Sequence, residues 1–178
     1  MHVTANGLQI EIDVQGPADG PPLLLIMGLG MPLVGWPEEL VALLVQRGFR
    51  VIRLDNRDAG LSQGFEAYGV PSLTAASLRY LLHLRVRCAY TLADMAADAL
   101  AVLDVLGIPT ALLRRIQAPT RIIHGQADPL VPVAAAHDLQ RKIAGASAEI
   151  IPGMGHDLPQ ALLPRLAGSL ASHLQAAG

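Results

Sequence analysis

An acid and a histidine in the C-terminal third are the residues best suited to do chemistry. Asp128 follows a predicted strand over residues 120–125, and His156 stands between glycine and aspartate after a second predicted strand over residues 148–151. Short runs with paired isoleucines, bounded by glycine or proline, indicate strands, so both residues are expected just beyond strand ends. A carboxylate beside an imidazole is an arrangement used in general-base catalysis. Such a pair needs a nucleophile, and the sequence offers no obvious one.

Ser62 is the central serine of a G-x-S-x-G pattern at residues 60–64. This pattern marks a nucleophile when it forms a sharp turn directly between a strand and a helix. Ser62 instead comes eight residues after Leu54 and is followed by a loop punctuated by glycine and proline. Two interpretations stay open: a structural turn residue, or a relocated nucleophile.

The remaining polar residues of these loops are interpreted structurally. Asp55, Arg57 and Asp58 are expected to form an ion-pair network that shapes their loop. His124, at the end of the strand over residues 120–125, is expected to make a structural hydrogen bond. No metal-ligand spacing and no glycine-rich phosphate loop followed by lysine is present, so neither a metal nor a cofactor is expected.

Strand and helix patterns alternate along the chain. Asn6-Gly7 between residues 3–5 and 8–14 predicts an antiparallel hairpin. Further strands are predicted at residues 23–27, 49–54, 120–125 and 148–151, and helices at 38–47, 72–86, 91–106, 132–143 and 162–176. This alternation predicts one α/β domain over residues 1–178, with a mostly parallel sheet flanked by helices. In such folds, function collects beyond the carboxyl ends of the strands.

Composition limits the partners. The chain is 52% hydrophobic and carries a net charge of -2, which argues against a nucleic-acid partner. No apolar run approaches the length of a membrane span, so no membrane partner is expected. A single cysteine cannot form an internal disulfide, and the N-terminus lacks the pattern of a secretory signal, so a cytoplasmic protein is expected.

Several motifs, in order, resemble one family. They are the Met-Gly-Leu-Gly run at residues 27–30, the acidic and glycine-containing loop at 55–62, the helix start at 90–98, the strand and turn at 124–132, and the Gly-His pair at 155–156. Together they resemble the α/β-hydrolases, in the esterase branch that includes aclacinomycin methylesterase-like and proline iminopeptidase-like proteins. The resemblance implies that Asp128 is a triad acid and His156 the general base. It also implies an oxyanion donor at the backbone N–H of Leu29, between Gly28 and Gly30.

One part of the family pattern is missing. The resemblance implies a strand, a nucleophile elbow and a cap before residue 118, and their absence indicates an internal deletion near residues 110–116. Either the strand over residues 23–27 pairs with the strand that precedes Asp128, or another chain fills the gap. Direct pairing would place the strand ending at Leu54 about 10 Å from the acid-bearing strand, with Ser62 within reach of His156.

Two functions are therefore predicted as alternatives. The chain is a shortened ester hydrolase of low activity, in which Asp128 and His156 act on small hydrophobic esters with Ser62 or with water. Alternatively, it is an inactive remnant of such an enzyme that acts through binding. Its exposed strand edges would then favour a homodimer.

Overall fold

The computed structural model describes residues 1–28, 30–69, 72–84, 88–108 and 120–176. The chain forms two compact units from alternating stretches. The first unit comprises residues 1–14, 24–35 and 52–110, and the second comprises 15–23, 36–51 and 111–178. The proposed deletion near residues 110–116 lies outside the described residues. The expectation of one domain over residues 1–178 stays a prediction.

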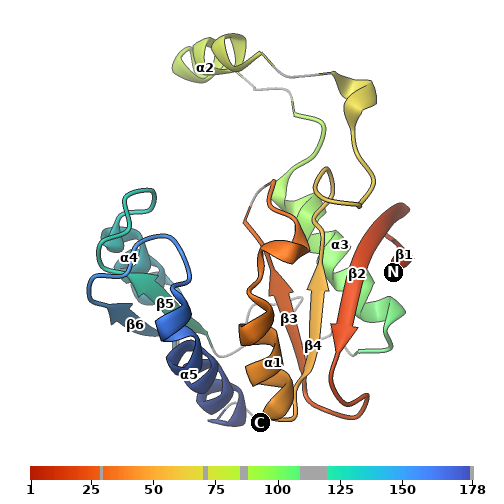
Figure 1. The fold of residues 1–178 in the computed structure, drawn as a ribbon. Coiled ribbons are helices and arrows are strands. Elements are labelled where there is room, and N and C mark those ends of the chain that lie inside the picture. The colour runs from red at the N-terminus through yellow and green to blue at the C-terminus, as the bar shows by residue number, and fades with distance from the viewer. Residues whose placement is uncertain (29, 70–71, 85–87, 109–119, 177–178) are drawn as a thin grey trace. The chain divides into compact units, whose positions relative to one another are not determined.

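A four-stranded sheet begins with the predicted hairpin. Strands β1 (His2–Ala5) and β2 (Leu8–Gln15) pair antiparallel with Val3 opposite Ile10. Asn6 and Gly7 supply the turn because both adopt the positive φ that it requires, 49° and 76°. Strands β3 (Pro22–Ile26) and β4 (Arg50–Leu54) complete the sheet in the order β1-β2-β4-β3, which can be followed in Figure 1.

The second sheet has two strands. Strands β5 (Arg121–Gly125) and β6 (Ser147–Ile151) pair in parallel, with Gly125 opposite Ile151. Within the described part of the chain, β3 pairs with β4 and β5 pairs with β6. The pairing of β3 with β5, which one sequence-based alternative required, stays a prediction.

Most helices begin and end within a few residues of their predicted bounds. They are α1 (Glu38–Gln46), α2 (Leu73–Leu81), α3 (Leu92–Val105), α4 (Val133–Lys142) and α5 (Leu163–Ala176), with short 3-10 turns η1 (Leu33–Gly35), η2 (Glu66–Tyr68) and η4 (Gln160–Leu162). Helix α3 begins with a capping box in which Thr91 and Asp94 exchange hydrogen bonds. Helix α2 ends earlier than predicted because His83 has a φ of 54°, which a continuing helix excludes.

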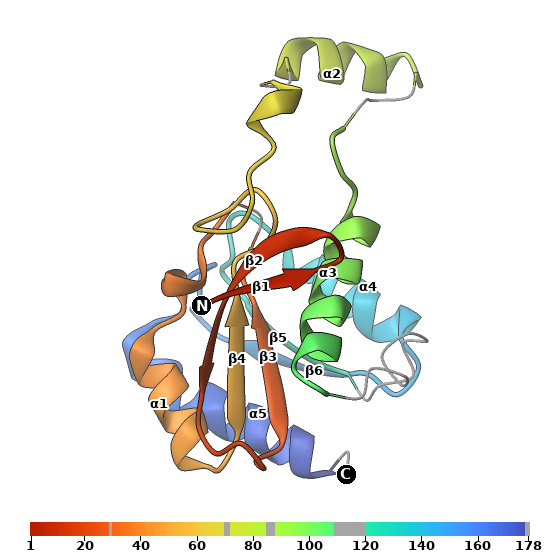
Figure 2. The same ribbon diagram turned by 90° about the vertical axis from the view of Figure 1, so that its right-hand side faces the viewer.

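Each unit has its own apolar packing. In the first unit, α3 packs against β1, as Figure 2 shows, over a core of Val3, Ala5, Ile10, Ile12, Leu54, Ala99 and Val102. In the second unit, α1 packs against α5, and α4 packs against both β5 and β6. Among the described residues, no helix is both long and apolar enough to cross a membrane.

Candidate active site

The turn after β5 holds Asp128 in one orientation. Its Oδ1 accepts hydrogen bonds from the backbone N–H groups of Leu130 (2.8 Å) and Val131 (2.9 Å). An aspartate that binds the backbone two and three residues ahead closes its own turn. Its side chain is only 6% exposed. The carboxylate is thus fixed by local sequence, and Oδ2 is left for a partner from elsewhere.

Gly125 lets the loop after β6 approach this turn. A side chain at Gly125 would meet the carbonyl oxygens of Met154 and Gly155 at 2.3 and 2.2 Å. The N–H of Ala127 donates to the carbonyl of Met154 (3.0 Å), and the N–H of Gln126 donates to that of Ile151 (3.0 Å). These backbone contacts bring the loop that carries His156 alongside the turn that carries Asp128.

The result is the acid–histidine pair that the sequence predicted. His156 Nδ1 lies 2.8 Å from Asp128 Oδ2. Because a carboxylate can only accept, His156 must carry its proton on Nδ1, which leaves a lone pair on Nε2 in the neutral ring. The imidazole is 55% exposed, so it can receive a proton from a solvent-side reactant. This is the tautomer that a general base requires.

Hydrogen bonds keep the acid ionised. The N–H of Val131 contributes most, and with His156 and Leu130 it lowers the pKa of Asp128 to about 2, against the opposing effect of desolvation. The carboxylate is consequently negative throughout the neutral range. It can therefore stabilise the positive charge that His156 would acquire as a base.

His124 is a second histidine near the acid. Its Nδ1 donates to the carbonyl of Gly125 (2.8 Å), as expected of a structural histidine. Its Nε2 is buried, has no hydrogen-bond partner among the described residues, and lies 3.9 Å from Asp128 Oδ2. Sequence reasoning missed this proximity, although the spacing of four residues across the strand end was visible.

The glycines of the expected oxyanion loop follow β3. Gly28 and Gly30 are exposed, and the N–H of Met31 donates to the carbonyl of Gly28 (3.0 Å), closing a tight turn. Gly30 has a φ of 73°, which disfavours other residues. Leu29, the expected donor, lies outside the described residues. These glycines belong to the first unit and Asp128 to the second, so the oxyanion role stays a prediction.

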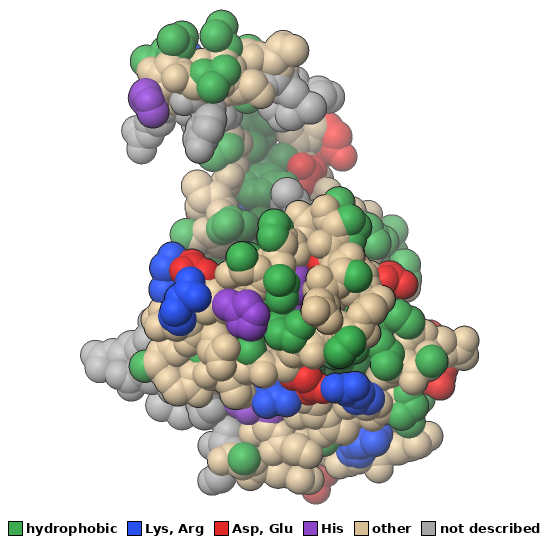
Figure 3. Space-filling view, turned by 90° about the vertical axis from the view of Figure 1, so that its left-hand side faces the viewer, with side chains coloured by type: hydrophobic (Ala, Val, Ile, Leu, Met, Phe, Trp, Pro, Cys, Tyr) green, Lys and Arg blue, Asp and Glu red, His purple; other side chains and the backbone are tan. Residues whose placement is uncertain are grey.

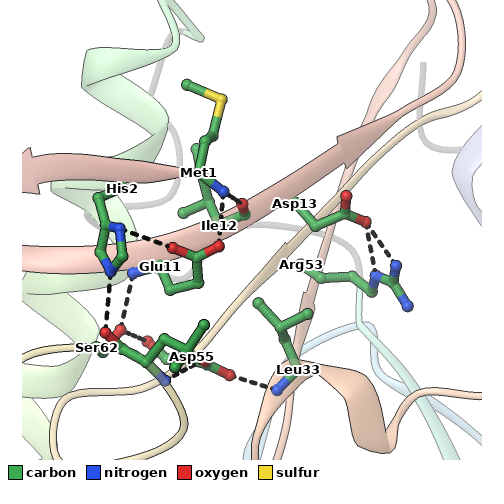
Figure 4. Close-up of polar contacts among 10 residues, drawn as sticks. Met1, His2, Glu11, Ile12, Asp13, Leu33, Arg53, Asp55 and Ser62 are labelled. Atoms are coloured by element: carbon green, nitrogen blue, oxygen red, sulfur yellow. Dashed lines mark hydrogen bonds and ion pairs between the residues drawn. The ribbon is translucent and has the colours of Figure 1, made fainter.

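Ser62 makes two hydrogen bonds to backbone within the first unit (Figure 4). Its hydroxyl donates to the carbonyl of Asp55 (2.7 Å) and accepts from the N–H of Glu11 (2.9 Å). The side chain is buried, and the hydroxyl joins the loop after β4 to β2. These contacts favour the structural interpretation of Ser62.

The expected ion-pair network around Asp55, Arg57 and Asp58 is wrong in its partners. Asp55 instead accepts a hydrogen bond from the backbone N–H of Leu33 (Figure 4). It also accepts one from the backbone N–H of Leu61. Arg57 pairs with Asp98 of α3, through Nε to Oδ2 (2.6 Å) and Nη2 to Oδ1 (2.7 Å).

Asp58 stabilises its own loop by accepting hydrogen bonds rather than by an ion pair. Its Oδ1 accepts from the N–H of Phe65 (3.0 Å), and its Oδ2 accepts from the hydroxyl of Tyr90 (3.3 Å). The loop is thus tied to the backbone, to α3 and to an aromatic side chain. In the described ranges, no three His, Cys, Asp or Glu side chains gather as a metal site, and the expectation of no metal stays a prediction.

Known proteins resemble this chain in sequence and in fold. It is 38% identical over 101 residues to the rhodomycin D methylesterase of Streptomyces peucetius, covering 54% of this chain and 34% of that protein. It is 36% identical over 101 residues to the rhodomycin D methylesterase of Streptomyces sp. strain C5, with the same coverage. The chain thus spans about a third of the length of these curated relatives. No protein-family model matches it.

Solved structures share the fold. The enol-lactonase from Burkholderia xenovorans LB400 aligns with a TM-score of 0.73 at 15% identity, over 98% of this chain and 100% of that one. Such low identity shows the fold alone, which is the α/β-hydrolase fold with an N-terminal antiparallel hairpin. The chain therefore has the α/β-hydrolase fold, and over the matched segment its sequence is similar to that of the two methylesterases.

Proposed function

We propose that the chain hydrolyses small hydrophobic carboxylic esters, with Asp128 and His156 as its acid–base pair. The observation that carries this proposal is the 2.8 Å contact between His156 Nδ1 and Asp128 Oδ2. The opposite carboxylate oxygen is held by two backbone N–H groups, so the pair is preorganised before any reactant arrives.

The chemistry follows from the tautomer. His156 Nε2 removes a proton from a nucleophile, either a serine hydroxyl or a water molecule, as the oxygen attacks the ester carbonyl carbon. The imidazolium formed is stabilised by Asp128 and then returns the proton to the alkoxide when the carbon–oxygen bond to the alcohol breaks. Attack by water yields the acid and the alcohol directly. This route is slower than one with a covalent intermediate, so a low activity is expected.

Apolar surface beside the acid supports an uncharged substrate. Leu130 and Val131 donate their backbone N–H groups to Asp128 and leave their side chains exposed. Small esters with an apolar acyl or alcohol group fit such a surface. The relatives named as methylesterases support a short alcohol group, and methyl esters are therefore the first substrates to test.

A second function is favoured by a different observation. The hydroxyl of Ser62 is engaged by Asp55 and Glu11, and β3 and β5 each have one partner strand among the described residues. Unpaired strand edges are seldom left open in stable proteins. An inactive chain that forms a homodimer through these edges is the alternative to the esterase.

Substitution of the pair separates the two functions. The purified chain is incubated with a chromogenic methyl or short-chain ester, and initial rates are compared for His156→Ala and Asp128→Asn. The esterase proposal expects His156→Ala to abolish turnover and Asp128→Asn to lower kcat by on the order of 10⁴, because the amide favours the wrong tautomer. His137→Ala, which removes an exposed histidine from α4, is the matched control and should retain the wild-type rate.

A covalent probe identifies the nucleophile. A fluorophosphonate labels an activated serine, and peptide mapping locates the label. Label on Ser62 that is lost in His156→Ala would establish the relocated nucleophile, whereas turnover without label would support water. Wild-type hydrolysis no faster than that of His156→Ala would refute the esterase. Sedimentation at micromolar concentration tests the homodimer, and a clean monomer would contradict it.

A further inference from the structure

A pocket lies beside α5 within the second unit. Its volume is about 480 Å³, which is in the range of pockets that hold small molecules. We call it the α5 pocket. Its ionised lining residues are Arg121 on β5, Glu149 on β6 and Arg165 on α5. Figure 3 shows basic and acidic side chains side by side on one face of the molecule.

The charges of these three residues do not cancel. Glu149 Oε1 accepts a hydrogen bond from Arg165 Nε (2.9 Å). Glu149 Oε2 accepts from Arg121 Nη2 (2.9 Å) and from the hydroxyl of Ser169 (2.6 Å). Two guanidinium groups thus share one carboxylate, which leaves one positive charge among the three residues. Because both oxygens of Glu149 are engaged, a cationic ligand would find no free acceptor there.

Donors around the pocket remain without an acceptor in the described part of the chain. Arg165 uses Nε and Nη2 toward Glu149, and its Nη1 has no acceptor. The Nε of Arg121 is buried and has no partner either. The hydroxyl of Ser172, which also lines the pocket, makes no hydrogen bond. Buried N–H groups nearly always have an acceptor, so these donors indicate a ligand that accepts hydrogen bonds.

We propose that the α5 pocket binds a small organic molecule with one carboxylate, held beside Glu149 by Arg165 and Arg121. The two guanidinium groups lie close together because both donate to the same side chain. Guanidinium donors match the geometry of a carboxylate, and one negative charge matches the one positive charge left over. A phosphate dianion fits less well, because the last turn of α5, which also lines the pocket, carries partial negative charge.

The remainder of the ligand is expected to be small and uncharged. Gly168 and Ala176 line the pocket without polar side chains. An added Cβ at Gly168 would meet no atom within 4 Å, so this part of the wall is open. The α5 pocket is also separate from the acid–histidine pair, because Arg121 begins β5 whereas Asp128 follows the end of that strand. The proposal therefore does not depend on the proposed function.

An NMR titration tests the proposal. The isotope-labelled full chain is titrated with butyrate at neutral pH and constant ionic strength, while the backbone amide signals are followed. Butyramide, which is uncharged, and inorganic phosphate are titrated separately. We expect saturable shifts of signals from the α5 pocket with butyrate, and weaker binding of the other two compounds. Arg165→Gln should raise the Kd for butyrate on the order of tenfold, because a charge-assisted hydrogen bond is lost.

A second variant fills the pocket and leaves its charges in place. Gly168→Leu adds a side chain where space is open, and leucine favours a helix over glycine, so the variant should fold and lose butyrate binding. Arg141→Gln is the matched control for charge, because Arg141 is an exposed arginine of α4 that also pairs with a carboxylate, and it should bind as the wild type does.

Circular dichroism checks that every variant is folded. The absence of saturable shifts in the folded wild type would overturn the proposal, as would binding of butyramide or phosphate as tight as that of butyrate. Shifts confined to the loops around Asp128 and His156 would also overturn it, because the ligand would then occupy the other site. A Kd that stays unchanged in folded Arg165→Gln and Gly168→Leu would have the same consequence.

Discussion

Removal of Asp98 should cost the first unit much of its stability. Asp98 is 2% exposed and Arg57 is 8% exposed, and they share two hydrogen bonds of 2.6 and 2.7 Å. The side-chain amide of Asn6 also donates to Asp98 (2.8 Å). The hydrogen bonding that Arg57 donates to Asp98 is the main cause of the raised pKa of Arg57. Asp98→Ala would leave the guanidinium charged and buried without its counter-charge.

The expected loss is about 3–5 kcal/mol, the cost of breaking a buried ion pair by removing one partner. The guanidinium carbon of Arg57 also lies 5.6 and 5.4 Å from the ring centres of Phe65 and Tyr90. These rings attract a cation and would remain in the variant, which places the loss at the lower end of that range. Among typical domains only about 5–15 kcal/mol separates the folded from the unfolded state, so the effect is large.

Urea unfolding followed by circular dichroism measures this loss. With a slope of about 2 kcal/mol per molar urea, a loss of 3 kcal/mol lowers the midpoint by about 1.5 M. Asp138→Ala is the matched control, because Asp138 pairs with Arg141 and Lys142 at the surface of α4, where an ion pair contributes little to stability. Arg57→Met with Asp98→Leu should recover most of the loss, since apolar residues replace the whole pair. A midpoint for Asp98→Ala equal to that of Asp138→Ala would refute the reasoning.

Two further predictions concern stability. Gly60→Ala should destabilise the chain by about 2 kcal/mol or more, because Gly60 has a φ of 57° and an added Cβ would lie 2.0 Å from the carboxylate of Asp55. Gly69→Ala is the control, because Gly69 has a φ of 72° and an added Cβ there would meet no other atom, so the loss of stability should be only about 1 kcal/mol. Equal losses of stability for Gly60→Ala and Gly69→Ala in thermal unfolding would contradict the role of Asp55. Hydrogen bonds from Ser169 and then from Arg121 help lower the pKa of Glu149 from 4.5 to about 2. Because the folded-state pKa is depressed, the contribution of Glu149 is present above pH 4.5 and is lost as pH falls toward 2. In Glu149→Gln the free energy of unfolding should therefore fall less than in the wild type as the pH is lowered from 4.5 to 2. An equal fall in the two proteins would contradict the role of the Glu149 ion pairs.

The sequence predicted features that depend on neighbouring residues. Asn6-Gly7 fixed the hairpin because few other dipeptides accept two positive φ values, and Thr91 with Asp94 fixed the start of α3 because a capping box is complete within four residues. The pairing of Asp128 with His156 was also predicted, through two predicted strands that end in turns. Adjacent parallel strands bring their carboxyl ends together, so the order of the elements was sufficient.

Contacts between distant residues were decided only by the tertiary structure. Arg57 was assigned a partner within its own loop but binds Asp98 on α3, and the hydroxyl of Ser62 is engaged by Glu11 on β2. A pattern such as G-x-S-x-G records the types of residues, whereas reactivity depends on which donors and acceptors surround the side chain. The sequence alone thus determined the local turns, the caps and the order of acid and histidine. The fold decided which buried polar groups meet, because every such group must find its partner wherever packing places one.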